Sequence, residues 1–120
     1  MSILVCEDNK VVTLTISAIL TRAGYQTELA YDGNKAIDLL NKNDYSLILV
    51  DIHLPYHSGL ELVKYVRSHL NKKTPIIVVS NFSDPQILDQ AKELGADDYI
   101  IKPIDPVHLI KQIKSFEKNT

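Results

Sequence analysis

The sequence predicts an α/β protein with a doubly wound, five-stranded parallel sheet and helices on both faces. Strand-like and helix-like hydrophobic periods alternate along the 120 residues without a linker or low-complexity segment, which is typical of a three-layer sandwich. The 45% hydrophobic content supplies one sizeable core, and we expect a single domain over residues 1–120. Four short runs are apolar almost throughout, as strands buried on both faces are; they are residues 4–8, 47–51, 76–80 and 99–103.

The first strand and its following helix are marked by a change of hydrophobic period. After the run at 4–8, apolar residues recur at helical spacing; they are Val12, Ile16, Ile19, Leu20 and Ala23. Gly24 follows where a left-handed helix cap belongs. We therefore expect a helix from roughly Asn9 to Ala23.

The next two units are shorter. Residues 26–30 alternate like an edge strand, and Asp32-Gly33 turns into a short helix; its apolar residues are Ala36, Ile37 and Leu40. After the run at 47–51, a loop shaped by Pro55 and Gly59 leads to a helix near Ser58; its apolar face comprises Leu62, Val63, Val66 and Leu70.

The last two helices have clear start signals. Both begin Asp-Pro, at Asp84-Pro85 and Asp105-Pro106, where Asp can cap free amides and Pro suits the first helical position. With right-handed crossovers, the strand order that brings strands one, three, four and five around one site is 2-1-3-4-5, a flavodoxin-like sheet.

Composition argues against several function classes. The formal net charge is −2 and no run of Lys or Arg occurs, so we expect no nucleic-acid or membrane partner. No apolar stretch approaches the roughly 20 residues of a membrane span, and no secretory leader is recognisable. The only cysteine, Cys6, lies inside an apolar run, which excludes a disulfide framework and favours a cytoplasmic protein.

Residues that could handle a phosphoryl group stand at the ends of the four apolar runs. Glu7 and Asp8 end the first run, Asp51 the second and Ser80 the third, while Lys102 lies in the fourth. The carboxyl ends of strands in a doubly wound sheet open into one crevice. Three carboxylates, a hydroxyl and an ammonium would then converge.

This set of groups is chemically complete for phosphoryl transfer. Clustered carboxylates repel one another unless a cation neutralises them, and hard oxygen ligands suit Mg²⁺ shared with a phosphate. The carboxylate of Asp51 can attack phosphorus and form an aspartyl phosphate. Ser80 can donate to a phosphoryl oxygen, and Lys102 supplies a mobile cation.

Each residue alone also has an ordinary structural explanation. An Asp at a strand-to-helix junction, such as Asp8, often only caps the helix, and Tyr99 by default is a half-buried aromatic residue. We favour function because four strand ends supply complementary groups in the right order. The histidines lack a shared ligand spacing, so we assign none of their side chains to a metal or to catalysis; they are His53, His57, His69 and His108.

Several short motifs are those of one family. They are Val5-Cys6-Glu7-Asp8-Asn9, Gly24-Tyr25, Ala30-Tyr31-Asp32-Gly33, Leu49-Val50-Asp51, Pro55 with Gly59, Val79-Ser80, and residues 95–103 from Gly95 to Pro103. With them the chain closely resembles the response-regulator receiver domain of bacterial two-component signalling, in its single-domain, chemotaxis-regulator-like form, over essentially its whole length.

The resemblance implies a phosphoacceptor and a magnesium site. The residue matching Asp51 would accept phosphate from a sensor histidine kinase or a histidine phosphotransfer protein. Asp8 would ligate Mg²⁺ directly and Glu7 largely through water, with Asp51 and the backbone carbonyl of His53 completing the protein ligands. The domain would be a signalling switch rather than an enzyme, with at most self-catalysed phosphorylation and dephosphorylation.

The resemblance also implies how the signal leaves the site. Ser80 would move toward the phosphoryl group and Tyr99 would swing inward behind it. A downstream target protein would then read the surface formed by the fourth helix, fifth strand and fifth helix. The Lys102-Pro103 peptide bond is expected to be cis, which is energetically accessible before proline.

Three residues depart from the family pattern or tune it. Glu7 replaces the more frequent Asp, which does not threaten function. Asn81 stands where Ala or Gly is general, so we expect altered phosphorylation or dephosphorylation rates. His53 occupies a position that tunes the attack of water on the aspartyl phosphate.

Two alternative functions stay open. A haloacid dehalogenase-like phosphohydrolase uses similar groups, but it carries its nucleophile on the first strand as Asp-x-Asp, whereas this chain has its first acids at Glu7-Asp8 and reads Asp51-Ile52-His53 later. A pseudo-receiver would be an interaction module not regulated by phosphorylation. Since the fifth helix is followed by no output domain here, the protein is expected either to work alone or to be an excerpt of a larger one.

Overall fold

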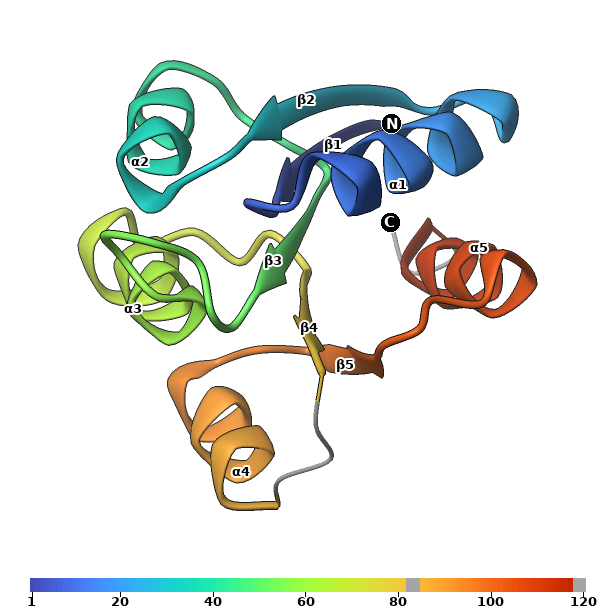
Figure 1. The fold of residues 1–120 in the computed structure, drawn as a ribbon. Coiled ribbons are helices and arrows are strands. Elements are labelled where there is room, and N and C mark those ends of the chain that lie inside the picture. Colours follow the sequence, from blue (N-terminus) through green and yellow to red (C-terminus); the bar gives the residue numbers. More distant parts are fainter. Residues whose placement is uncertain (82–84, 118–120) are drawn as a thin grey trace.

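The fold is a parallel sheet between two layers of helices (Figure 1). The structure is a computed structural model that describes residues 1–81 and 85–117. Its strands are β1 (Ser2–Cys6), β2 (Gln26–Ala30), β3 (Leu47–Asp51), β4 (Ile76–Ser80) and β5 (Asp98–Ile101). Its helices are α1 (Lys10–Arg22), α2 (Gly33–Lys42), α3 (Gly59–Lys64) with the π-helical segment η1 (Tyr65–His69), α4 (Pro85–Leu94) and α5 (Pro106–Glu117).

The strands lie in the order β2-β1-β3-β4-β5, and every pair is parallel. The predicted fold class and strand order are therefore confirmed. In Figure 1, α1 and α5 cover one face of the sheet, and α2, α3 and α4 cover the other. No helix within residues 1–81 and 85–117 is long and apolar enough to cross a membrane.

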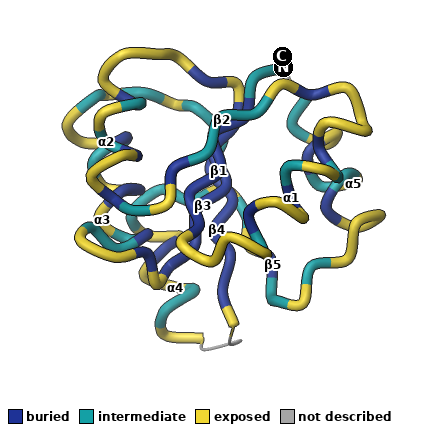
Figure 2. The backbone as a smooth tube through the Cα atoms, turned by 45° about the horizontal axis from the view of Figure 1, so that its top comes forward, coloured by how far each residue is buried: buried dark blue, intermediate teal, exposed yellow. Residues whose placement is uncertain are grey.

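Alternating strand residues build two cores, one on each face. On β3, Leu47 and Leu49 pack with residues of α1 and α5, whereas Ile48 and Val50 pack with residues of α2, α3 and α4. Figure 2 shows the central strands buried along most of their length. Strands buried on both faces are continuous apolar runs in the sequence, so their positions could be predicted.

Helix α1 follows its prediction closely but differs in the residues it buries. Asn9 is the N-cap, because its side-chain oxygen accepts a hydrogen bond from the Val12 N–H at 3.1 Å. Gly24 adopts a φ of 94° after the helix, as expected for a left-handed cap. The fully buried stripe comprises Thr13, Ile16 and Leu20. Ala23, expected on the apolar face, is exposed because the chain turns away there.

Three predicted helix starts carry a side-chain cap. Asp32 accepts from the Lys35 N–H at 2.8 Å, and Asp105 accepts from the Val107 N–H at 3.1 Å. Ser58 caps α3 through the Glu61 N–H at 3.2 Å. Helix α4 begins at Pro85 as predicted, whereas the expected cap Asp84 lies outside the described residues.

The third helix differs from the sequence-based expectation. Instead of one regular helix through Leu70, its second half is the π-helical segment η1, in which the Leu70 N–H donates to the Tyr65 carbonyl. Tertiary contacts hold this turn: Arg67 donates to the Gly95 carbonyl at 3.0 Å and to Asp97 Oδ2 at 2.9 Å. Apolar spacing alone does not reveal such a local widening, because it depends on distant partners.

Candidate functional site

Three carboxylates meet where β1 and β3 end. Oxygen atoms of Glu7, Asp8 and Asp51 all lie within 4.8 Å of one another. Glu7 and Asp51 are buried, with 2% and 5% of their surface exposed, whereas Asp8 is exposed. The parallel register that pairs Cys6 with Val50 brings these two strand ends level. The cluster is therefore a direct product of the sheet order.

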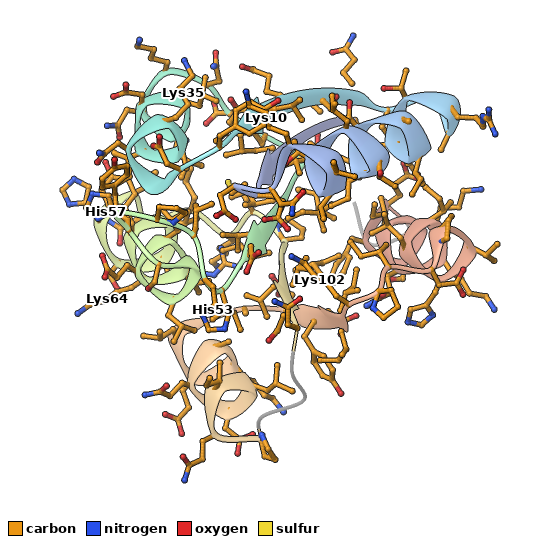
Figure 3. The ribbon with its side chains drawn as sticks, viewed as in Figure 1. Lys10, Lys35, His53, His57, Lys64 and Lys102 are labelled. Atoms are coloured by element: carbon orange, nitrogen blue, oxygen red, sulfur yellow. The ribbon has the colours of Figure 1, made fainter. Side chains whose placement is uncertain are left out.

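Lys102 joins two of these carboxylates. It follows β5 immediately, at a cis peptide bond to Pro103, as predicted. Its ammonium group donates to Glu7 Oε1 and, at 3.0 Å, to Asp51 Oδ2. In Figure 3 Lys102 lies near the middle of the view, whereas His57 and Lys64 lie at the outer edge beside α3.

Asp51 is held in its ionised form. Burial alone would raise the pKa of its carboxyl, but hydrogen bonds from the His53 N–H, Glu7 and Lys102 outweigh this effect and hold the pKa below its ordinary value. The His53 N–H donates to Asp51 Oδ1 at 2.8 Å. Burial likewise tends to lower the pKa of Lys102, yet its contacts with Glu7 and Asp51 raise it. The site thus presents an anionic oxygen beside a fixed cation.

Glu7 behaves differently from Asp51. Burial, together with the neighbouring Asp51 carboxylate, raises the pKa of Glu7 to about 7 despite the hydrogen bond from Lys102. Its other oxygen, Oε2, accepts from the Asn9 N–H at 3.3 Å. At neutral pH and without a metal ion, Glu7 therefore exchanges between protonated and ionised forms.

Ser80 lies at the same edge of the sheet. It ends β4, is 1% exposed, and pairs with Ile101 in the β4–β5 register. Its carbonyl accepts a hydrogen bond of 2.8 Å from the Lys102 N–H. The last residue of β4 is thereby hydrogen-bonded to the residue that follows β5, next to the carboxylates.

Comparisons with known proteins show the family to which the chain belongs. The family described as "Response regulator receiver domain" matches residues 3–114. The chain belongs to the response regulator receiver family. This receiver domain is 39% identical, over 114 residues, to the transcriptional regulatory protein DltR of Streptococcus agalactiae, a match that covers 95% of the chain and 50% of DltR. The chain thus spans about half the length of such curated relatives.

Solved structures give the same result. The receiver domain of the Francisella response regulator 1452 is 30% identical with a TM-score of 0.91, covering 98% of this chain and 97% of that chain. The chemotaxis protein CheY4 of Vibrio cholerae is also 30% identical, with a TM-score of 0.90 and coverage of 96% and 97%. Both matches therefore cover nearly the whole chain.

The predicted residues fall into two groups in this receiver domain. Glu7, Asp8, Asp51 and Lys102 form one cluster, with Ser80 at the same edge. Tyr99 is not part of it, because it lies on β5 with 49% of its surface exposed. Its inward swing stays a prediction.

The histidines show no common site among the described residues. His57 Nδ1 lies 3.1 Å from Glu61 Oε2, and the His69 ring stacks on Tyr65 at 4.7 Å. His53 touches the site through its backbone N–H. Its carbonyl as a metal ligand stays a prediction.

Two residues that position the site were not assigned that role from sequence. Thr13 is fully buried and its hydroxyl oxygen lies 3.0 Å from the Glu7 carbonyl oxygen. Gly59 packs so closely that a Cβ atom there would lie 2.4 Å from the Asp51 carbonyl oxygen. A sequence signal existed for Thr13, since it falls at helical spacing with Ile16 and Leu20 on the inward stripe of α1.

Proposed function

We propose that this receiver domain is a phosphorylation-controlled switch that takes a phosphoryl group from a phosphohistidine protein onto Asp51. The observation that carries the proposal is the environment of Asp51: a buried carboxylate, held ionised, that touches Lys102 and adjoins Glu7 and Asp8. A buried anion beside a fixed cation is suited to attack phosphorus, since the cation stabilises negative charge on the transferred group.

The transfer has a simple balance of bonds. An oxygen of the Asp51 carboxylate forms a bond to phosphorus while the bond from phosphorus to the histidine ring nitrogen of the donor breaks. The electron pair of the broken bond stays on that ring nitrogen, which afterwards takes up a proton. Lys102 would bind a phosphoryl oxygen, and the Ser80 hydroxyl would donate to another. The His53 N–H, on Asp51 Oδ1 at 2.8 Å, orients the carboxylate.

The residues present fit a bound Mg²⁺. The three carboxylates with oxygens within 4.8 Å of one another are hard ligands of the type that Mg²⁺ prefers, and the exposed Asp8 leaves an open approach. Glu7, Asp8, Asp51 and the His53 carbonyl would hold the ion. When bound, Mg²⁺ would supply positive charge that neutralises the phosphoryl oxygens.

We place the docking surface for a helix of the phosphohistidine protein in the groove between α1 and α5. This groove has a volume of about 900 Å³ and an apolar lining that includes Leu14 and Val107, exposed by 59% and 75%. Both helices begin just after residues of the site, so a partner seated there reaches Asp51. Together α1 and α5 carry four Lys or Arg residues and one acidic residue, whereas the whole chain has a net charge of −2. The complementary partner is an apolar helix with acidic flanks.

A variant of the groove separates docking from chemistry. Leu14→Asp should slow transfer from a phosphorylated sensor kinase that labels the wild type, but leave labelling by the small donor acetyl phosphate unchanged. Lys64→Asp, at an exposed position on α3, is the control and should change neither rate. Equal slowing with both donors would contradict this docking surface.

The signal would leave through the surface of α4, β5 and α5. The Ser80 carbonyl accepts a hydrogen bond of 2.8 Å from the N–H of Lys102, the residue that follows β5. Tyr99 lies three residues before Lys102, on β5, and is half exposed. Movement at Ser80 would therefore reach Tyr99 along β5, and a downstream target protein would bind the altered surface. A Tyr99→Ala variant should accept phosphate normally but lose the phosphate-dependent part of target binding.

The first experiment is intact mass after incubation with acetyl phosphate and Mg²⁺, comparing the wild type with Asp51→Asn. We expect one added phosphoryl group on the wild type alone. No addition, together with no effect of beryllofluoride and Mg²⁺ on the backbone amide spectrum, would favour the pseudo-receiver, in which the exposed Asn81 beside Ser80 hinders phosphorylation. Rapid release of phosphate from many phosphomonoesters would favour a phosphohydrolase instead.

A further inference from the structure

We propose that Thr13 is a positioning residue for the Mg²⁺ site, because its hydroxyl holds the loop that carries Glu7 and Asp8. The proposal rests on the proposed function, since it concerns the metal site of that function. Thr13 lies outside the carboxylate cluster itself. Thr13 touches neither Asp51 nor Lys102 through any of its hydrogen bonds within residues 1–81 and 85–117.

The starting observation is a hydroxyl in an apolar environment. Thr13 is 0% exposed and lies on the inner stripe of α1 with Ile16 and Leu20. Burial of a hydroxyl costs free energy unless it is hydrogen-bonded, and Val has nearly the same shape without that cost. A Thr at this position therefore indicates that the hydroxyl has a specific partner.

The hydroxyl oxygen of Thr13 lies near two backbone acceptors. It is 2.9 Å from the Asn9 carbonyl oxygen and 3.0 Å from the Glu7 carbonyl oxygen. The bond to Asn9, four residues back, is the common contact of a helical Thr with its own helix. The bond to Glu7, six residues back, leaves the helix and reaches the end of β1. The single hydroxyl hydrogen is thus shared, as a three-centre hydrogen bond, between the carbonyl oxygens on both sides of Asp8.

This bridge restrains the two acidic residues. Asp8 lies between the two acceptors with an exposed side chain, so the position of its carboxylate depends on the backbone on either side. The Asn9 N–H adds a second restraint, through its bond of 3.3 Å to Glu7 Oε2. Mg²⁺ demands near-ideal octahedral geometry, so a loop that samples several backbone conformations should bind the ion less tightly. Loss of a residue that orients metal ligands typically lowers metal affinity about 10- to 100-fold.

The same helix offers a matched control. The Thr15 hydroxyl donates to the Val11 carbonyl at 2.7 Å, which is the same contact four residues back, but Thr15 is exposed and makes no bond to the acidic loop among the described residues. Thr15→Val therefore removes a helical hydroxyl and leaves the loop alone. Thr13→Ser removes the methyl group of Thr13 and keeps the bridge.

The test is the dissociation constant of Mg²⁺, measured by isothermal titration calorimetry on the full chain at one pH. We expect Thr13→Val to raise the dissociation constant about tenfold, while Thr13→Ser and Thr15→Val keep the wild-type value. Backbone amide hydrogen exchange without metal gives a second readout. The Asp8 and Asn9 amides should exchange faster in Thr13→Val than in the wild type, and at the wild-type rate in Thr15→Val.

Each other outcome overturns the proposal, and the outcomes point to different causes. If a folded Thr13→Val bound Mg²⁺ as tightly as the wild type, the bridge would not position the carboxylates. The same would follow if Thr15→Val lost as much Mg²⁺ affinity as Thr13→Val. If Thr13→Val does not fold, Thr13→Ser tests the proposal in its place. Weaker Mg²⁺ binding by the Thr13→Ser variant would show that packing of the methyl group, and not the hydroxyl, positions the site. A wild type that binds no Mg²⁺ would overturn the metal site of the proposed function together with this inference.

Discussion

The Lys102 ammonium nitrogen lies 3.0 Å from Asp51 Oδ2, although 51 positions separate the two residues in the chain. The contact exists because β4 lies between β3 and β5 and all three strands run in the same direction. The same ammonium donates to Glu7, which follows β1. One cation from an edge strand thereby balances carboxylates from two inner strands.

Loss of this cation should destabilise the protein in a pH-dependent way. Lys102→Met leaves the buried carboxylates of Glu7 and Asp51 without their partner, and breaking a buried ion pair costs roughly 3 kcal/mol of unfolding free energy. The loss should be largest near pH 8 and smaller at pH 5, because protonation of Glu7 removes one of the two charges. Urea unfolding at both pH values, without Mg²⁺, measures it.

The control for this variant is another lysine near the loop. Lys10 is exposed at the start of α1, so Lys10→Met should change the unfolding free energy by less than about 0.5 kcal/mol. A pH-independent loss in Lys102→Met would mean that the lost packing of the side chain, rather than its charge, sets the cost.

Glu7 should make the metal-free protein less stable as pH rises toward neutrality. Its pKa is about 7 in the folded protein and 4.5 in an ordinary setting, so between these values the folded state binds more protons than the unfolded state. The stabilisation, on the order of 3 kcal/mol of unfolding free energy, is therefore complete below about pH 4.5 and is lost as pH rises through about 7.

A Glu7→Gln variant tests this sign. In the presence of EDTA, the unfolding free energy of the wild type should fall steadily relative to that of Glu7→Gln from pH 5 to pH 8. Asp51 does not mask the trend, since its lowered pKa places its own loss of stability below pH 3.8. A constant difference across this range would contradict the raised pKa of Glu7.

Mg²⁺ should raise the melting temperature of the wild type by mass action. A ligand that binds only the folded state stabilises it, by about 2.7 kcal/mol at 100 times its dissociation constant. Asp8→Ala should abolish the shift, because this exposed carboxylate is the one member of the cluster that Lys102 does not contact within the described residues. Melting curves with and without Mg²⁺ measure it, and a full shift in Asp8→Ala would contradict the assignment.

Gly59 should tolerate no side chain. A Cβ atom at this position would lie 2.4 Å from the Asp51 carbonyl oxygen and 2.7 Å from Ile52 Cα, so Gly59→Ala must push the loop away from the phosphoacceptor strand. We expect a loss of about 2–4 kcal/mol in urea unfolding together with slower labelling by acetyl phosphate.

Gly24→Ala separates this clash from backbone strain. Gly24 has a φ of 94°, but a Cβ atom there would meet no other atom within 4 Å, so the substitution should cost only about 1 kcal/mol and leave labelling unchanged. Equal losses of stability and labelling in the two variants would contradict a specific role for the close approach at Gly59.

The sequence predicted the strands better than the details of the helices. Strands buried on both faces need apolar residues throughout, so β1, β3 and β4 are visible as runs. No apolar pattern in the sequence indicates the π-helical turn at Tyr65–His69, because this turn is held by contacts of Arg67 with Gly95 and Asp97. The exposure of Ala23 was missed for a related reason, since periodicity does not say where a helix leaves the sheet.

The sequence by itself determined which chemical groups meet. Apolar runs that end in Glu7-Asp8, Asp51, Ser80 and Lys102 specify a parallel sheet, and a parallel sheet must collect those ends at one edge. Only the tertiary structure decided how the groups are held. Lys102 donates to both Glu7 and Asp51, hydrogen bonds lower the pKa of Asp51 whereas burial raises that of Glu7, and Thr13 bridges the backbone around Asp8. The physical reason is that residue type and period set which face a residue occupies, whereas hydrogen-bond partners and desolvation depend on atoms that chain folding brings from distant positions.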